Sequence, residues 1–173
     1  MDLEREIEAL FERYPSAIGR DLKVTLRRVL TSGALTPESA APALLALASA
    51  VRDGAIAELA ARWMRELGFS DEQVREAVES AAIYAMINLY FSFRDDVDKP
   101  EYESAGLTMT GVARPAIGKH QMERLAMALS VLNKCKPCVR YHEAKLRELG
   151  SSTDEIRDLA RLAAVVKGCD ALP

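Results

Sequence analysis

Apolar residues recur every three or four positions along most of the chain, which is the spacing that places them on one face of an α-helix. Two such series open the sequence, over residues 2–13 and 18–30. Thr36-Pro37 then begins an alanine- and leucine-rich helix that is expected to run to Val51, because threonine caps a helix and proline suits its first position. Further helices are predicted over residues 55–67, 71–93, 121–132, 137–149 and 153–166.

A segment without clear periodicity interrupts the helices in the middle of the chain. Residues 95–114 contain Pro100, Gly106 and Gly111, which predicts a long surface crossing. Elsewhere glycine, proline and aromatic residues are modest in number, which argues against a β-fold with many tight turns. We therefore expect one all-α domain over residues 1–173.

Two stretches of the chain echo each other. The segment Arg65 to Gly68 resembles the segment Arg147 to Gly150, and each is followed by an Asp-Glu pair. In both, the glycine stands where a helix ends in a left-handed residue, and the acidic pair opens the next helix at its positive end. This pattern predicts an internal helical repeat, with a first half at about residues 36–94 and a second, catalytic half at about residues 115–170.

The repeat register reveals an asymmetry between the two halves. Four reactive side chains of the second half, Glu123, Cys135, Cys138 and His142, align with Ala41, Asp53, Ile56 and Ala60 of the first. The scaffold is duplicated and the chemistry is not, which favours a functional interpretation of all four residues.

Composition limits the classes of function. The chain is 49% hydrophobic and 28% charged, which is ordinary for a soluble protein with a core. A net charge of −3 offers no basic field for nucleic acid. The acidic start is unlike a signal peptide and no apolar run is as long as a membrane span, so we expect no membrane association and a cytoplasmic location. In that reducing compartment, a close cysteine pair is better explained by catalysis or metal binding than by a structural disulfide.

The candidate chemistry lies in Cys135-Lys136-Pro137-Cys138, followed by His142. Cysteines at i and i+3 on a helix lie roughly 5 to 6 Å apart at Cα, close enough for a disulfide. His142, at i+4 from Cys138, shares its helical face and can accept its proton.

The surroundings of the pair in the sequence favour a reactive thiol. A helix start lowers a thiol pKa from about 8.5, and Lys134, Lys136 and Arg140 add positive charge. Glu123, on the neighbouring antiparallel helix, can orient His142 as the third member of a triad does.

Other interpretations of these residues remain open. The cysteines can be two small buried hydrophobes at a helix start. A non-catalytic zinc-binding or redox-sensing module can use Cys135, Cys138 and His142, with Glu123 or His120 as a fourth ligand. Zinc is less favoured, because compact structural sites usually draw on a second paired motif and the sequence has none. Cys169, the remaining cysteine, is predicted to be a buried structural residue.

These motifs carry a family resemblance. Glu123, the Cys135 to Cys138 motif, His142 and the segment Leu146 to Gly150 resemble the alkyl hydroperoxidase AhpD family, within the wider carboxymuconolactone decarboxylase-like group. Residues 81–94 are also similar to the central helix of that family. The resemblance implies an all-helical trimer and an antioxidant enzyme that reduces alkyl hydroperoxides. It also implies an adaptor that passes electrons from a dihydrolipoyl-bearing acyltransferase to the peroxiredoxin AhpC. No bound cofactor is expected, and a dihydrolipoamide-type dithiol is the expected electron donor.

The resemblance also implies a role for each site residue. Cys138 is the nucleophile that becomes a sulfenic acid, His142 is its base, and Glu123 orients the histidine. Cys135 is the proton donor and the resolving, partner-facing thiol. The spacing supports the same roles, because His142 lies one turn from Cys138 and two from Cys135. We expect Cys135 at the exposed end of the helix and Cys138 deeper within it.

The motif departs from the best-studied members of the family at one position. Pro137 stands where those proteins have a histidine, so one member of the proton relay is missing. Disulfide exchange needs only the paired thiols and a lowered pKa, and is therefore less affected than peroxide turnover. A decarboxylase is disfavoured, because that chemistry has no use for a dithiol.

Overall fold

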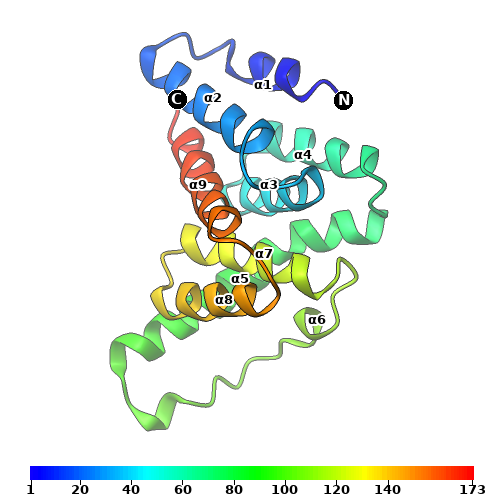
Figure 1. Ribbon diagram of the computed structural model, residues 1–173. Helices are drawn as coiled ribbons and strands as arrows, with labels where there is room; N and C mark the ends of the chain where they lie inside the picture. The colour runs from blue at the N-terminus through cyan, green and yellow to red at the C-terminus, as the bar shows by residue number, and fades with distance from the viewer.

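The computed structural model covers residues 1–173 and consists of helices joined by loops (Figure 1). The helices are α1 (Leu3–Phe11), α2 (Ala17–Thr31), α3 (Pro37–Val51), α4 (Gly54–Glu66), α5 (Asp71–Val97), η1 (Pro100–Tyr102), α6 (Thr110–Ala113), α7 (Lys119–Leu132), α8 (Lys136–Glu148) and α9 (Thr153–Asp170). The prediction of an all-α fold is confirmed. None of these helices combines the length and the hydropathy that a membrane crossing requires.

Two central helices organise the core. Every residue of α3 from Ser39 to Ala48 is buried, because α3 contacts α4, α5, α7 and α9. α7 packs against α3 and buries the run from Ala126 to Ser130. The small alanine side chains on both helices allow this close approach. The helices that carry the candidate chemistry are therefore attached to the buried core of the molecule.

The candidate motif lies where three helices meet. α7 and α8 lie side by side, and α5 crosses behind them (Figure 1). α5 contacts both of these helices, so it covers the junction between the end of α7 and the start of α8. The two N-terminal helices lie at the opposite end of the molecule, where α2 packs on α9 (Figure 1).

The predicted helix ends are present. Thr36 accepts a hydrogen bond from the Ser39 backbone N–H, with Pro37 in the first turn. Gly68 and Gly150, which follow α4 and α8, have φ of +89° and +90°. These matching ends support the internal repeat, which stays a prediction.

The segment that connects α5 and α7 contains more helical residues than the sequence pattern predicts. α5 continues to Val97 and ends where Asp98 has a φ of +48°, a region that aspartate tolerates better than most residues. Pro100 then opens the short η1, since its ring fixes φ near the helical value. α6 follows and packs Val112 against the core. The C-terminal helix also extends past the predicted end, to Asp170.

We predict that Gly150→Ala lowers the free energy of unfolding by about 1–2 kcal/mol, because an L-residue is strained at positive φ. A Cβ at Gly150 would meet no atom within 4 Å, so the cost is confined to the backbone. Gly54→Ala is the matched control, since Gly54 is helical and also has open space. The control is expected to be neutral or stabilising by up to about 1 kcal/mol. Urea denaturation of both variants checks this, and equal effects would contradict it.

Candidate active site

Cys135 is placed by a tight junction between α7 and α8. Lys134 has a φ of +58°, which turns the chain sharply after α7. The Cys135 backbone N–H donates to the Ser130 carbonyl at 3.0 Å, and Cys135 stands at the N-cap of α8. Asp53 stands in the same position before α4, and there the side chain caps the helix through the Ile56 N–H. The Cys135 side chain makes no such bond, which leaves its sulfur free for chemistry.

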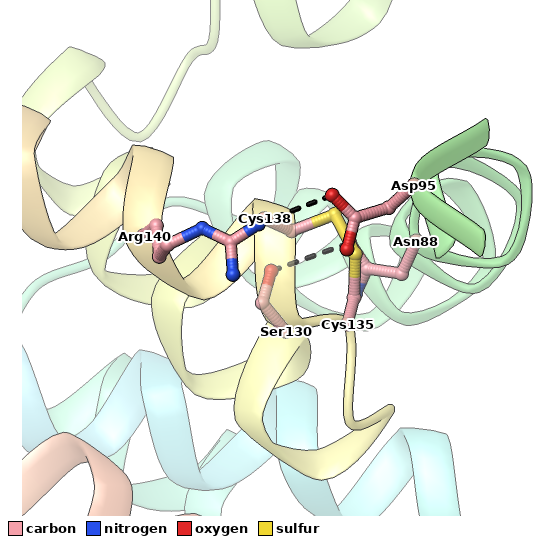
Figure 2. Close-up of a disulfide and its surroundings, with 6 residues drawn as sticks. All are labelled: Asn88, Asp95, Ser130, Cys135, Cys138 and Arg140. Atoms are coloured by element: carbon pink, nitrogen blue, oxygen red, sulfur yellow. Dashed lines mark hydrogen bonds and ion pairs between the residues drawn. A yellow bond between two sulfur atoms is a disulfide. The ribbon is translucent and has the colours of Figure 1, made fainter. Parts of the chain in front are cut away.

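The two motif cysteines form a disulfide. Their Cα atoms lie 5.3 Å apart, as the i, i+3 spacing predicts, and Figure 2 shows the bond between the two sulfur atoms. The predicted close approach of the two cysteines is therefore confirmed.

The burial of the two cysteines differs from the expectation. Cys135 is 0% exposed, so the prediction that it lies at the exposed end of the helix is wrong. α5 packs against both α7 and α8, and Cys135 is buried at their junction although the neighbouring Lys136 is exposed. Cys138 is 6% exposed and lines a cavity, so it is the sulfur that an outside molecule can reach.

The cavity has a volume of about 480 Å³ and lies between α5, α6, α7 and α8. Most of its wall is apolar, which suits an organic group better than a small polar molecule. It is lined by Tyr84, Ile87, Phe91, Arg94, Met109, Val112, Glu123, Pro137, Cys138, Tyr141 and His142. Three of the four predicted site residues are thus brought together in one wall.

His142 and Glu123 form the polar part of this wall. The His142 Nδ1 lies 2.6 Å from the Glu123 Oε2, a bond between α8 and α7. An ionised carboxylate only accepts, so Nδ1 carries the proton and the neutral ring keeps Nε2 as an acceptor. Both side chains are largely buried, with 9% and 25% exposed, so water screens their attraction weakly. The predicted pairing of these two residues is present in the structure.

Tyr84 is a cavity residue that the sequence analysis did not single out. It is buried, and the edge-to-face contact between its ring and that of His142 has a centroid distance of 5.9 Å. Burial raises the pKa of its hydroxyl, and the charge of Glu123 raises it further. Tyr84 is therefore a neutral hydrogen-bond donor at physiological pH. Its spacing with Ile87 and Phe91 is the signal that could have identified this face of α5.

The comparisons with known proteins agree with this geometry. The model of the carboxymuconolactone decarboxylase family matches residues 103–173. The alkyl hydroperoxide reductase AhpD of Anaeromyxobacter dehalogenans is 37% identical over 163 residues, covering 92% of this chain and 86% of the relative. A second AhpD, from an Anaeromyxobacter species, is 34% identical with the same coverage of both chains. The AhpD of Azorhizobium caulinodans is 32% identical over 163 residues, which cover 92% of this chain and 88% of the relative.

The chain belongs to the AhpD family. The relatives cover both the segment before the family match and the motif itself, so the relationship extends through the α1–α5 region as well as the reactive half.

The charges around the disulfide of this AhpD-family chain are partly compensated. Arg140 was expected to add positive charge near the thiols. Its Nη2 lies 3.1 Å from the Asp95 Oδ1, near the C-terminal end of α5 (Figure 2). The pair is half exposed, with 65% of the arginine and 40% of the aspartate side chain accessible. Its field at the sulfurs is therefore weaker than that of a lone arginine.

The other histidine and the third cysteine lie away from the AhpD site. The His120 Nε2 lies 2.8 Å from the Ser151 Oγ, and His120 is not part of the cavity wall. Its pKa is lowered, first by burial and then by Arg124. No three His, Cys, Asp or Glu side chains are grouped to hold a metal ion. Cys169 is buried as predicted, and burial together with the charge of Asp53 raises its pKa to about 11, which keeps it inert.

We predict that Glu123→Gln slows the reaction of the reduced protein with iodoacetamide and with tert-butyl hydroperoxide about tenfold, because the amide can still accept from Nδ1 but carries no charge. Glu123→Leu removes the acceptor as well and slows both reactions about a hundredfold. Rates are measured by intact mass after quenching. Glu143→Gln, on α8 and outside the cavity, is the control that should leave both rates unchanged. A Glu123→Leu rate within twofold of the wild type would exclude this role.

Proposed function

We propose that this protein is an antioxidant thiol peroxidase and disulfide oxidoreductase that reduces alkyl hydroperoxides with its Cys135–Cys138 dithiol. The observation that carries the proposal is the position of Cys138. It lines a largely apolar cavity whose wall also contains the His142–Glu123 pair, in a chain of the AhpD family.

The first step takes place at Cys138. His142 Nε2 accepts the thiol proton, and the resulting thiolate attacks the distal oxygen of the hydroperoxide. The O–O bond breaks, the alkoxide takes a proton and leaves as an alcohol, and Cys138 becomes a sulfenic acid. Glu123 stabilises the imidazolium that forms during the proton transfer.

The second step closes the disulfide. The Cys135 sulfur, as a thiolate, attacks the Cys138 sulfur and breaks its S–O bond. The hydroxide that leaves takes a proton and becomes water. The sum is the reduction of one hydroperoxide to an alcohol and water with the oxidation of one dithiol.

Regeneration requires an external dithiol. We propose a dihydrolipoamide-type donor on an acyltransferase, with no cofactor bound to this chain, and electron transfer onward to the peroxiredoxin AhpC. Cys138 is the sulfur that the donor attacks, because Cys135 is sealed by α5. The partner-facing role therefore moves from Cys135 to Cys138. Pro137 in place of a relay histidine favours exchange over rapid peroxide turnover.

We also propose that the protein is a homotrimer. α5 leaves an apolar stripe exposed on the side away from the cavity, which is unusual for a chain that acts alone. The stripe consists of Val78, Met86, Leu89 and Phe93, and Leu89 is 76% exposed. A second copy of the chain is the occupant that the family resemblance implies.

We predict that one equivalent of tert-butyl hydroperoxide removes two hydrogens from the mass of the reduced protein, and that dihydrolipoamide restores them. Cys138→Ser abolishes peroxide consumption, because the nucleophile is lost. Cys135→Ser consumes one equivalent and stops as a sulfenic acid that dimedone traps. Tightly bound zinc with no consumption of peroxide would instead support the zinc-binding or redox-sensing alternative.

We predict that Val112→Trp lowers kcat/KM for cumene hydroperoxide about tenfold and leaves that for hydrogen peroxide within twofold, because the indole fills space that only an organic group needs. Val112 lines the cavity from α6 and is only partly buried. Val24→Trp, at an exposed site on α2, is the control. Equal losses for both peroxides would show that the cavity does not hold the organic group.

A further inference from the structure

One buried polar atom of the protein has no hydrogen-bond partner, and it belongs to Asn88. Asn88 lies on α5 and is 1% exposed. Its Oδ1 accepts from the Ser130 hydroxyl at 3.2 Å, but the hydrogens on Nδ2 meet no acceptor. An orphaned donor at this depth is costly, and it is most easily explained where another state of the protein supplies the acceptor.

The Asn88 side chain extends toward the disulfide. Figure 2 shows it pointing from α5 toward the Cys135–Cys138 bond, with a dashed line that joins it to the Ser130 hydroxyl. Ser130 joins both partners, because its carbonyl accepts the Cys135 N–H at 3.0 Å while its hydroxyl donates to Asn88. Ser130 therefore fixes both the backbone of Cys135 and the orientation of the Asn88 carboxamide.

The state that lacks the disulfide creates the missing acceptor. A sulfur in a disulfide accepts hydrogen bonds weakly, whereas a thiolate accepts them strongly. Cys135 is 0% exposed, so water cannot solvate the charge that appears on its sulfur when the bond opens. A buried thiolate needs a donor from the protein.

We propose that the Asn88 Nδ2–H stabilises the Cys135 sulfur as a thiolate each time the disulfide opens, and so sets the equilibrium between disulfide and dithiol. This role rests on the proposed redox function of the pair. The Cys135 sulfur is the leaving group when the disulfide is reduced and the attacking group when it forms. Asn88 acts on this sulfur in both directions, and it needs no contact with the peroxide.

The reductive step balances as follows. A thiolate of the donor dithiol attacks the Cys138 sulfur, a bond forms between them, and the disulfide electrons pass to Cys135, which leaves as a thiolate bonded to Asn88. The second donor thiolate then attacks the donor sulfur of the mixed disulfide, and Cys138 leaves as a thiolate. Two electrons pass from the donor to the cysteine pair, and the two donor protons go to the cysteines or to solvent.

The test compares Asn88→Leu and Asn88→Asp with the wild type in buffers of reduced and oxidised dithiothreitol. Leucine removes the donor, and aspartate keeps the shape while replacing the donor with an oxygen. In both variants we expect the equilibrium to shift about tenfold toward the disulfide, which is about 30 mV for a two-electron couple. Quenching with acid and alkylation, followed by intact mass, gives the ratio of the two forms.

Thermal unfolding of both redox forms separates this role from a packing role. Asn88→Leu should destabilise the reduced form more than the oxidised form, because both forms lose the Ser130–Asn88 bond and only the reduced form also loses the donor to Cys135. Ser80→Ala is the matched control. Ser80 is also buried on α5, but its hydroxyl donates only to the Ala77 carbonyl, so the equilibrium of this variant should stay within twofold of the wild type.

Equilibria within twofold of the wild type for both Asn88 variants would overturn the proposal, as would equal destabilisation of the two redox forms. If Asn88→Leu does not fold, the isosteric Asn88→Asp variant decides. The measurement uses no peroxide. A wild-type protein that exchanges with dithiothreitol but consumes no peroxide would refute the proposed peroxidase function and leave the Asn88 result standing.

Discussion

The packing of α5 across the junction of α7 and α8 is the constraint on which the site depends. It buries Cys135 completely and leaves Cys138 at the wall of a cavity that α5 also lines. Two cysteines three residues apart thus have different surroundings although they share one turn of helix. The difference arises from tertiary packing and not from the motif, which by itself treats the two thiols almost alike.

Two hydrogen bonds between helices then distinguish the surroundings of the two cysteines. The Glu123–His142 bond lies on the Cys138 side and fixes which imidazole nitrogen is free to accept a proton. The Ser130–Asn88 bond lies on the Cys135 side and holds the Asn88 carboxamide, whose Nδ2 has no hydrogen-bond partner. Each bond links two different helices, so both form only in the folded chain. In the proposed reaction, a base serves the thiol that meets the substrate and a donor serves the thiol that water cannot reach.

The sequence was sufficient for features that depend on one helix or on two adjacent ones. The i, i+3 spacing of the cysteines, the start of α8 and the pairing of Glu123 with His142 follow from helical periodicity and a short antiparallel connection. The burial of Cys135 could not be predicted in this way, because it depends on α5, which is far away in the chain. α5 is 27 residues long and uses different faces for α7, α8 and solvent, so its apolar residues show no single stripe. Tyr84 and Asn88 were missed for the same reason, and the Asp95–Arg140 pair depends on where α5 ends.

A single route to the reactive sulfur has consequences for the order of events. In the proposed function, peroxide and electron donor both approach Cys138 through the same cavity, so each excludes the other and the protein alternates between two half-reactions. A cavity of about 480 Å³ admits a slender dithiol at the end of a flexible arm more readily than a cysteine held on a folded surface. This is why we propose a lipoyl group as the reductant. Exchange with a peroxiredoxin requires more of Cys138 to be exposed, and the segment best placed to provide this is the crossing that carries α6, since Met109 and Val112 form the cavity wall and yet belong to the least helical part of the chain.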